Sequence, residues 1–182
     1  MDYESPYLDG RQFGMPKSCR VHRLANIACQ IHAGENCRID AFVTVTGNVT
    51  LGQGVHLSTG SLISGGFDCY MGDWSALSPG AKIFTATDDI ESGLLASFEG
   101  SGIERAMKGR PVFVGRYTPI GANSVVLPGV AIGERCQIGA LSLVTGNVPS
   151  GWIYAGVPAR PVRQRPPLKY IDAPLSYDNV GC

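Results

Sequence analysis

An aliphatic residue recurs at every sixth position from residue 114 to residue 149, and this period limits the folds open to the chain. The second residue of these hexads is often glycine, and the fifth is small or β-branched. A six-residue period fits neither an α-helix nor an alternating strand. It is typical of a solenoid in which the first and fifth residues fill the core and glycine permits the backbone of a corner. The first positions are Val114, Ile120, Val126, Ile132, Ile138 and Val144, and the fifth are Thr118, Ser124, Val130, Cys136, Ser142 and Val148.

The same period extends back to residue 21. Eight hexads begin at Val21, and three more begin at Met71 after two extra residues at 69 and 70. Three hexads make one triangular coil of about 18 residues, and coils stack at roughly 4.8 Å, the spacing of neighbouring strands. The seventeen hexads therefore predict an all-β fold, a parallel β-helix over Val21–Val148 with between five and six coils. Phe67 falls on a fifth position, so we expect its side chain inside.

The period stops between residues 89 and 113, which form one long insertion. A loop of this length inside a compact domain favours a functional role, although a tolerated surface excursion is the alternative. We therefore expect an N-terminal arm (residues 1–20), a β-helix domain (21–163) that carries the loop 89–113, and a proline-rich C-terminal tail (164–182).

Composition narrows the class of protein further. The formal net charge is zero, so the sequence gives no reason to expect a nucleic-acid surface. No apolar run approaches the ~20 residues of a membrane span, and the acidic first residues do not resemble a signal peptide. We expect a soluble, cytoplasmic protein. Its six cysteines form no C-x-x-C pair, and Cys37 and Cys136 fall on inward positions, so we interpret these two as packing residues in a reduced compartment.

The segment Ala155-Gly-Val-Pro-Ala-Arg160 follows the last hexads. Together with the repeats, it resembles the hexapeptide-repeat acyltransferases, and more closely their maltose, galactoside and xenobiotic acetyltransferase branch. The resemblance implies a left-handed β-helix and a homotrimer in which acetyl-CoA lies in the groove between two subunits, with no metal. It also implies acetyl transfer to a hydroxyl or an amine of a sugar or nucleotide sugar, in polysaccharide biosynthesis. The sequence leaves open which acceptor is used.

The resemblance also suggests which residues contact the acyl donor. They are Ala122, Ala140, Thr145, Arg160 and Arg163. The two arginines match a pair that reaches the nucleotide phosphates, and a planar guanidinium suits phosphate contact. The lysine that usually follows the threonine is Gly146 here.

The general base departs from the family pattern. Relatives read Thr-Ala-Thr-His before the loop, whereas this chain reads Thr-Ala-Thr followed by Asp88 and Asp89. A carboxylate with an ordinary pKa near 4 is a weaker base than imidazole. We therefore expect His56 to be the best single candidate base, because imidazole titrates near neutral pH and this outward position could face a neighbouring subunit. Asp88 would then orient it or serve as the base itself, and Asp89 would help to bind the acceptor. An exposed or structural role for His56 is the alternative.

Two other classes of protein share the expected fold. A γ-type carbonic anhydrase needs three histidines around one zinc ion, two of them closely spaced, whereas this chain has His22, His32 and His56, which are 10 and 24 residues apart. A non-catalytic β-helix scaffold would have no use for the matched coenzyme A positions. We therefore favour the acyltransferase interpretation over both.

Overall fold

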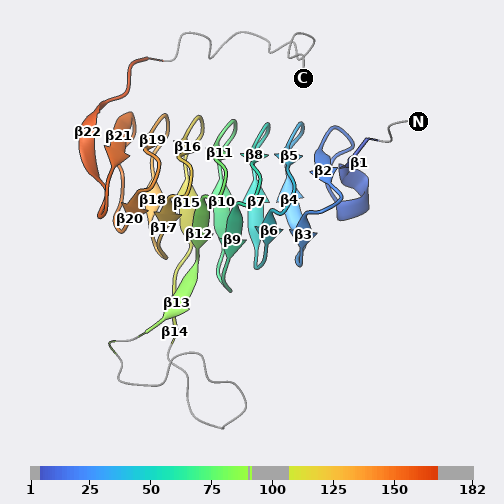
Figure 1. The fold of residues 1–182 in the computed structure, drawn as a ribbon, viewed down its shortest axis with the longest axis horizontal. Coiled ribbons are helices and arrows are strands. Elements are labelled where there is room, and N and C mark those ends of the chain that lie inside the picture. Colours follow the sequence, from blue (N-terminus) through green and yellow to red (C-terminus); the bar gives the residue numbers. More distant parts are fainter. Residues whose placement is uncertain (1–4, 90, 92–106, 168–182) are drawn as a thin grey trace.

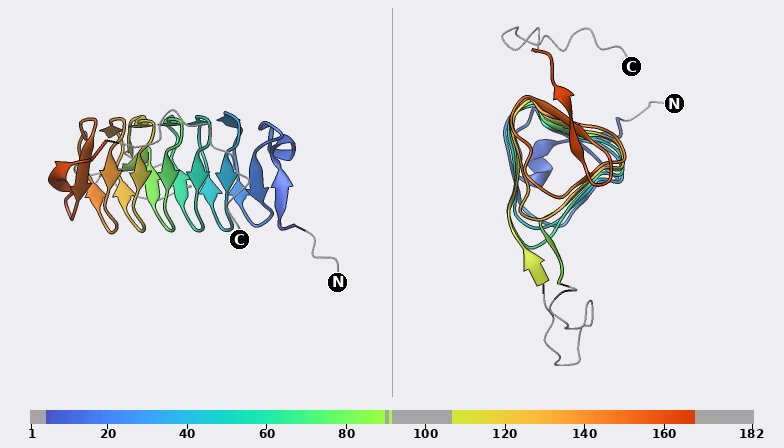
Figure 2. Two further views of the ribbon diagram at one scale, coloured as in Figure 1. Left: turned by 90° about the horizontal axis from the view of Figure 1, so that it is seen from above. Right: turned by 90° about the vertical axis from the view of Figure 1, so that its left-hand side faces the viewer.

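The computed structural model describes residues 5–89, 91 and 107–167, and in them the chain winds as a left-handed β-helix (Figure 1). The coils are triangular in cross-section, and a hairpin leaves the solenoid at one corner (Figure 2). The expected fold class is confirmed. Expectations for residues 1–4, 90, 92–106 and 168–182 lie outside the described residues.

Three sheets form the sides of the triangle. Sheet 1 contains β1 (Tyr7–Asp9), β2 (Arg20–His22), β5 (Arg38–Ile39), β8 (His56–Leu57), β11 (Ala76–Leu77), β16 (Pro119–Ile120), β19 (Gln137–Ile138), β21 (Trp152–Ala155) and β22 (Arg160–Gln164). Sheet 2 contains β3 (Asn26–Ile27), β6 (Thr44–Val45), β9 (Leu62–Ser64), β12 (Lys82–Phe84), β17 (Val125–Val126) and β20 (Leu143–Val144). Sheet 3 contains β4 (Ile31–Ala33), β7 (Val49–Leu51), β10 (Cys69–Met71), β15 (Val112–Val114) and β18 (Ala131–Ile132). The hairpin is β13 (Ala86–Asp88) and β14 (Met107–Gly109), and a short 3-10 helix, η1, covers Gly10–Phe13.

The chain passes from sheet 1 to sheet 2 to sheet 3 in each coil, so the prism has three edges. We call them edge 1–2, edge 2–3 and edge 3–1 after the sheets that they join. Strands of successive coils pair in parallel, as when Ile120 of β16 lies beside Ile138 of β19. The stack is longer than the hexads indicate, because β21 also pairs in parallel with β19 although it follows the last hexad. In sheet 1, the described residues give seven coils in place of five to six.

Both ends of sheet 1 are closed by antiparallel strands. The expected arm supplies β1, which pairs with β2, and residues after the expected solenoid supply β22, which pairs with β21. These strands occupy the hydrogen-bonding edges that a parallel solenoid leaves open at each end. No helix among the described residues is long and apolar enough to cross a membrane.

The core is the column of inward side chains that the hexads predict. Of the first positions, Ile120, Leu77 and Ile83 are fully buried, and the fifth positions of the final block are buried as well. Phe67 is an exception among the fifth positions, because its side chain is 40% exposed. Cys69 takes the buried place instead, two residues later, so the two extra residues lengthen the corner before β10. The expectation for Phe67 is therefore wrong.

Most corners of the described coils use one residue with positive φ. Along edge 1–2 these residues are Phe42, Gly60, Gly80, Asn123 and Leu141. Along edge 3–1, Gly54 has φ of +65°, and a Cβ at this position would overlap the indole ring of Trp74 in the next coil. Glycine at position 54 thus meets two requirements: it adopts a left-handed backbone conformation, and it leaves room for the Trp74 ring of the next coil.

Two alanine substitutions separate these requirements. Gly60 has φ of +69° with open space around it, so Gly60→Ala should cost only the left-handed strain, about 1–2 kcal/mol. Gly54→Ala should cost the same strain plus about 1–3 kcal/mol for the displaced Trp74 ring. Denaturant unfolding of both variants measures the difference, and equal losses would contradict the packing role of Gly54.

Candidate functional site

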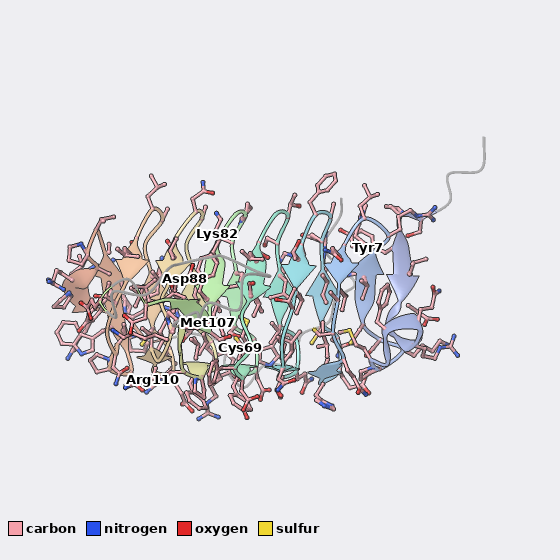
Figure 3. All side chains as sticks on the ribbon, turned by 90° about the horizontal axis from the view of Figure 1, so that it is seen from below. Tyr7, Cys69, Lys82, Asp88, Met107 and Arg110 are labelled. Atoms are coloured by element: carbon pink, nitrogen blue, oxygen red, sulfur yellow. The ribbon has the colours of Figure 1, made fainter. Side chains whose placement is uncertain are left out.

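The hairpin β13–β14 projects from edge 2–3 (Figure 2) and carries the two aspartates that replace the usual base motif, of which Asp88 is labelled in Figure 3. Asp88 lies opposite Met107 in the antiparallel ladder. The Asp89 carboxylate lies 2.8 Å from Nζ of Lys108, which also contacts Glu91 at 2.9 Å. Hydrogen bonds to Asp89 and then Glu91 raise the pKa of Lys108. Asp89 is therefore engaged by a cation within its own hairpin.

The hairpin rests on the lengthened corner before β10. A Cβ on Gly109 of β14 would overlap the ring of Phe67, and the Phe67 backbone N–H donates to Oγ1 of Thr85 at 3.3 Å. The Phe67 side chain, which lies outside the core, thus contacts the base of the hairpin at Gly109. Sequence periodicity could not reveal this contact.

His56 lies on the outer face of sheet 1, where Asp40 contacts it. Nε2 of His56 is 2.8 Å from Oδ2 of Asp40, while Oδ1 accepts hydrogen bonds from the Tyr7 hydroxyl at 2.6 Å and from Nε of Arg38 at 2.7 Å. Burial alone would raise the pKa of Asp40, but the hydrogen bonds from Tyr7, His56 and Arg38 outweigh it and hold this pKa below its ordinary value. Within the chain, Asp40 rather than Asp88 orients His56.

Sequence reasoning missed this cluster of Tyr7, Arg38, Asp40 and His56. One signal for part of it was present, because Arg38 and His56 occupy equivalent outward positions and lie side by side in the ladder. Asp40 is two residues beyond Arg38 and follows the same strand. Tyr7 comes from the arm, which has no period.

The residues matched to acyl-donor contacts fall on two edges of the prism. Ala122 and Ala140 lie at edge 1–2, where the Ala122 carbonyl accepts a hydrogen bond from the Leu141 N–H at 2.8 Å. Thr145 follows β20 at edge 2–3, and Arg160, the first residue of β22 in sheet 1, reaches the same groove. Both line a groove of about 250 Å³ that is also lined by Gly146, Asn147 and Tyr154.

Arg163 lies outside that groove, on the exposed strand β22 opposite Ile153. Within one chain the candidate residues therefore form no single site. Asp88 and Thr145 belong to edge 2–3, and Ala122 and Ala140 belong to edge 1–2, while Arg160 joins Thr145 from β22. They could serve one substrate only where these two edges come from different chains.

Arg165 is a structural arginine that the sequence did not reveal. Its Nη1 donates to the carbonyl oxygens of Tyr117 at 2.6 Å and Cys136 at 2.8 Å, and burial lowers the pKa of this guanidinium. It holds the start of the expected tail against edge 3–1. Within a proline-rich stretch, nothing in the residue pattern marks an arginine as partly buried and bound to two carbonyl groups.

The cysteines of the core behave as packing residues. Cys37 and Cys136 are buried, with Sγ of Cys37 3.1 Å from the Gly52 carbonyl oxygen. Burial raises the pKa of Cys37 and of Cys69 to about 12. Over residues 5–89, 91 and 107–167, no three His, Cys, Asp or Glu side chains are grouped as a metal site would require.

Comparison with known proteins agrees with this fold. A family described as "Hexapeptide repeat of succinyl-transferase" matches residues 111–145. The chain is 27% identical over 138 residues to a dTDP-4-amino-4,6-dideoxy-D-glucose acyltransferase of Escherichia coli, covering 74% of this chain and 72% of the relative. It is 26% identical over 133 residues to a galactoside O-acetyltransferase of Escherichia coli K12, covering 72% of this chain but only 62% of the relative.

Among solved structures, the chain is similar to AntD, an N-acyltransferase from Bacillus cereus. The crystal structure of AntD with dTDP and 3-hydroxybutyryl-CoA matches with a TM-score of 0.82 and 27% identity, covering 89% of this chain and 91% of AntD. Another AntD structure holds dTDP-4-amino-4,6-dideoxyglucose together with coenzyme A. The resemblance to hexapeptide-repeat sugar acyltransferases is thereby confirmed.

The Asp40 contacts predict a pH-dependent loss of stability. A carboxyl group with a lowered folded-state pKa stabilises the protein above its unfolded-state value of 3.8 and ceases to do so as the pH falls through the lower folded value. Asp40→Asn should cost about 1–3 kcal/mol at pH 7, because it leaves Arg38 and His56 without their charged partner. Thermal unfolding of both proteins at pH 7 and pH 3 should show the difference shrinking at pH 3. A constant difference would contradict this role.

Proposed function

We propose that this hexapeptide-repeat acyltransferase transfers an acyl group from coenzyme A to the amino group of a nucleotide-linked sugar. That the chain is an enzyme acting on a sugar or nucleotide sugar follows from the comparisons; the amine is our proposal. The observation that carries it is the similarity over nearly the whole chain to AntD, whose structures hold coenzyme A with a dTDP-linked amino sugar. Because nucleotide-linked sugars feed polysaccharide biosynthesis, we assign the reaction to that process and to the cytoplasm.

The groove at edge 2–3 is our candidate for the donor. Thr145 and Arg160 line it, and an exposed guanidinium there can pair with the phosphates of coenzyme A. Arg163 follows three residues later, where it can reach the same phosphates if the nucleotide end extends along β22. Because Gly146 stands where relatives have a lysine, we assign Arg160 and Arg163 as the cations that bind the nucleotide end of coenzyme A.

We further propose a homotrimer with three sites between subunits. A three-fold axis parallel to the solenoid turns edge 1–2 of one subunit toward edge 2–3 of the next. Ala122 and Ala140 of one subunit would then face Thr145, Arg160 and the hairpin of its neighbour. This assembly supplies what one chain does not, a single groove with all the matched residues.

Asp88 is our candidate for the residue that accepts the proton of the amine. Structures of AntD include variants at one aspartate and variants at one serine that precedes it by ten residues. In this chain, Ser78 precedes Asp88 by the same interval. Ser78 lies at edge 1–2 and Asp88 at edge 2–3, so the trimer would bring the two side chains of neighbouring subunits to one site.

The chemistry then follows from these two groups. The amine nitrogen attacks the thioester carbonyl carbon, and the new C–N bond leaves negative charge on the oxygen, which the Ser78 hydroxyl can stabilise by donating a hydrogen bond. The Asp88 carboxylate takes the proton from nitrogen. The C–S bond breaks, and the coenzyme A thiolate leaves and recovers that proton. His56, held by Asp40, is the second candidate base and suits a hydroxyl acceptor better.

Paired substitutions separate the two bases. If Asp88 takes the amine proton, Asp88→Asn should lower kcat by about 10²–10⁴-fold, the usual scale for a general base. His56→Ala should then stay within about tenfold of the wild type, as should the control His22→Ala on the same sheet face. The measurement is steady-state thiol release with a dTDP-linked amino sugar. Near-normal kcat for Asp88→Asn with a large loss for His56→Ala would reverse the assignment.

The proposed trimer and the proposed donor groove can each be tested. Light scattering at micromolar concentration should give three times the chain mass, and active monomers would contradict the proposed sites.

Arg160→Ala should raise the KM for acetyl-CoA by about 10-fold, the effect of losing a charge-assisted phosphate contact of about 1.5 kcal/mol. It should leave the KM for the acceptor unchanged, and Arg23→Ala, an exposed arginine far along the solenoid, is the matched control.

A further inference from the structure

The outer face of sheet 3 carries a column of side chains, one from each successive coil. His32 lies beside Thr50, Thr50 beside Tyr70, and Tyr70 beside Phe113 in the parallel ladder. The rings of Tyr70 and Phe113 are stacked, with centroids 5.0 Å apart and an interplanar angle of 4°. Both rings are well exposed, Tyr70 at 38% and Phe113 at 46%. Phe113 covers one face of Tyr70, and the other face looks toward Thr50.

Thr50 leaves a gap of the size of a planar ring. His32 and Tyr70 are two coils apart, or roughly 9.6 Å at the ordinary strand spacing. A ring stacked between two planar groups needs about 3.5 Å on each side, so one ring fits above the small Thr50 side chain. The column is therefore a slot with Tyr70 as one wall and His32 as the other.

Polar groups line the same depression. The groove has a volume of about 600 Å³, and its lining includes His32, Thr50, Tyr70, Asn48, Gln30 and Asp68. The Tyr70 hydroxyl donates to Oδ2 of Asp68 at 3.2 Å, which places that carboxylate at the rim of the slot. Amide and carboxylate groups around an aromatic wall suit a heterocycle with ring N–H and carbonyl groups. The negative charge of Asp68 disfavours a phosphate here.

The groove lies on the same edge as the hairpin and the donor groove. It covers the edge 2–3 corners of the coils that precede the hairpin, whereas the groove of Thr145 and Arg160 belongs to a coil that follows it. Figure 1 shows the hairpin leaving the solenoid between these two groups of coils. A donor and an acceptor that approach from opposite sides would meet at Asp88.

We propose that the slot between Tyr70 and His32, above Thr50, binds the nucleobase of the nucleotide-linked acceptor. This inference rests on the proposed function and names residues that recognise its substrate. The base stacks on the free face of Tyr70, and Asp68 and Asn48 accept and donate hydrogen bonds at its edge. The adenine of coenzyme A is the other nucleobase in the reaction, but its phosphates are assigned to arginines on the far side of the hairpin.

Filling the slot tests the proposal while leaving the Tyr70 and His32 walls and the polar rim in place. Thr50→Phe should raise the KM for a dTDP-linked amino sugar by about 5- to 150-fold, the range expected for losing one base–aromatic stack. Its kcat and its KM for acetyl-CoA should not change. Tyr70→Ala should behave likewise, and Tyr70→Phe should keep the stack and most of the affinity. Ala131→Phe adds the same ring to the same sheet beyond Phe113 and serves as the control.

Calorimetric binding of dTDP alone separates the slot from the proposed reaction. Binding to the wild type that weakens in Thr50→Phe but not in Ala131→Phe supports the slot. Equal binding by all variants, with dTDP-sugar still acylated, overturns the slot and leaves the proposed function intact. A weaker affinity for coenzyme A alone in Thr50→Phe would assign the slot to adenine and overturn the inference. A wild type that acylates free amino sugars as well as nucleotide-linked ones, and does not bind dTDP, overturns the proposed acceptor itself.

Discussion

Parallel stacking of coils of equal length is the constraint on which the rest of the structure depends. Each strand hydrogen-bonds to the strand one coil away, so side chains equivalent in the repeat form columns along the prism. Inward columns are aliphatic or small, because a polar group there loses its water and is tolerated only with a partner, as when the Ser124 hydroxyl donates to the Gly139 carbonyl. Outward columns carry no such restriction, and the chain places its chemistry there, in the cluster around Asp40 and in the stack of Tyr70 and Phe113.

Departures from equal coil length in the described residues occur at edge 2–3, and the first two along the chain are coupled. The corner before β10 is two residues longer than its neighbours, and the hairpin leaves the next coil at the same edge. They depend on each other, since Phe67 from the lengthened corner packs where Gly109 leaves room for its ring. These irregularities create the surface around Asp88.

The fold could be predicted because every hexad independently indicates the same thing, that its first and fifth residues point into the core. A single misplaced residue, such as Phe67, does not disturb a pattern supported by buried residues such as Leu57, Ile83 and Ile120. The candidate site offered no such redundancy. Matching to known acyltransferases singled out Thr145 and Arg160, which the structure brings together, but neither the period nor the match indicated Asp40, Tyr7 or Arg165. Each of these acts through contacts with residues distant in sequence.

The sequence by itself determined the period, the inward faces, the class of fold and the place where the period stops, because these depend on the spacing of side chains along the chain. Only the tertiary structure decided which outward residues meet. It placed Asp40 against His56, tied Asp89 to Lys108, and separated Asp88 from His56 on different parts of the prism. The physical reason is that a solenoid fixes the direction of every side chain locally, whereas contacts between coils, arms and hairpins depend on how the whole chain is wound.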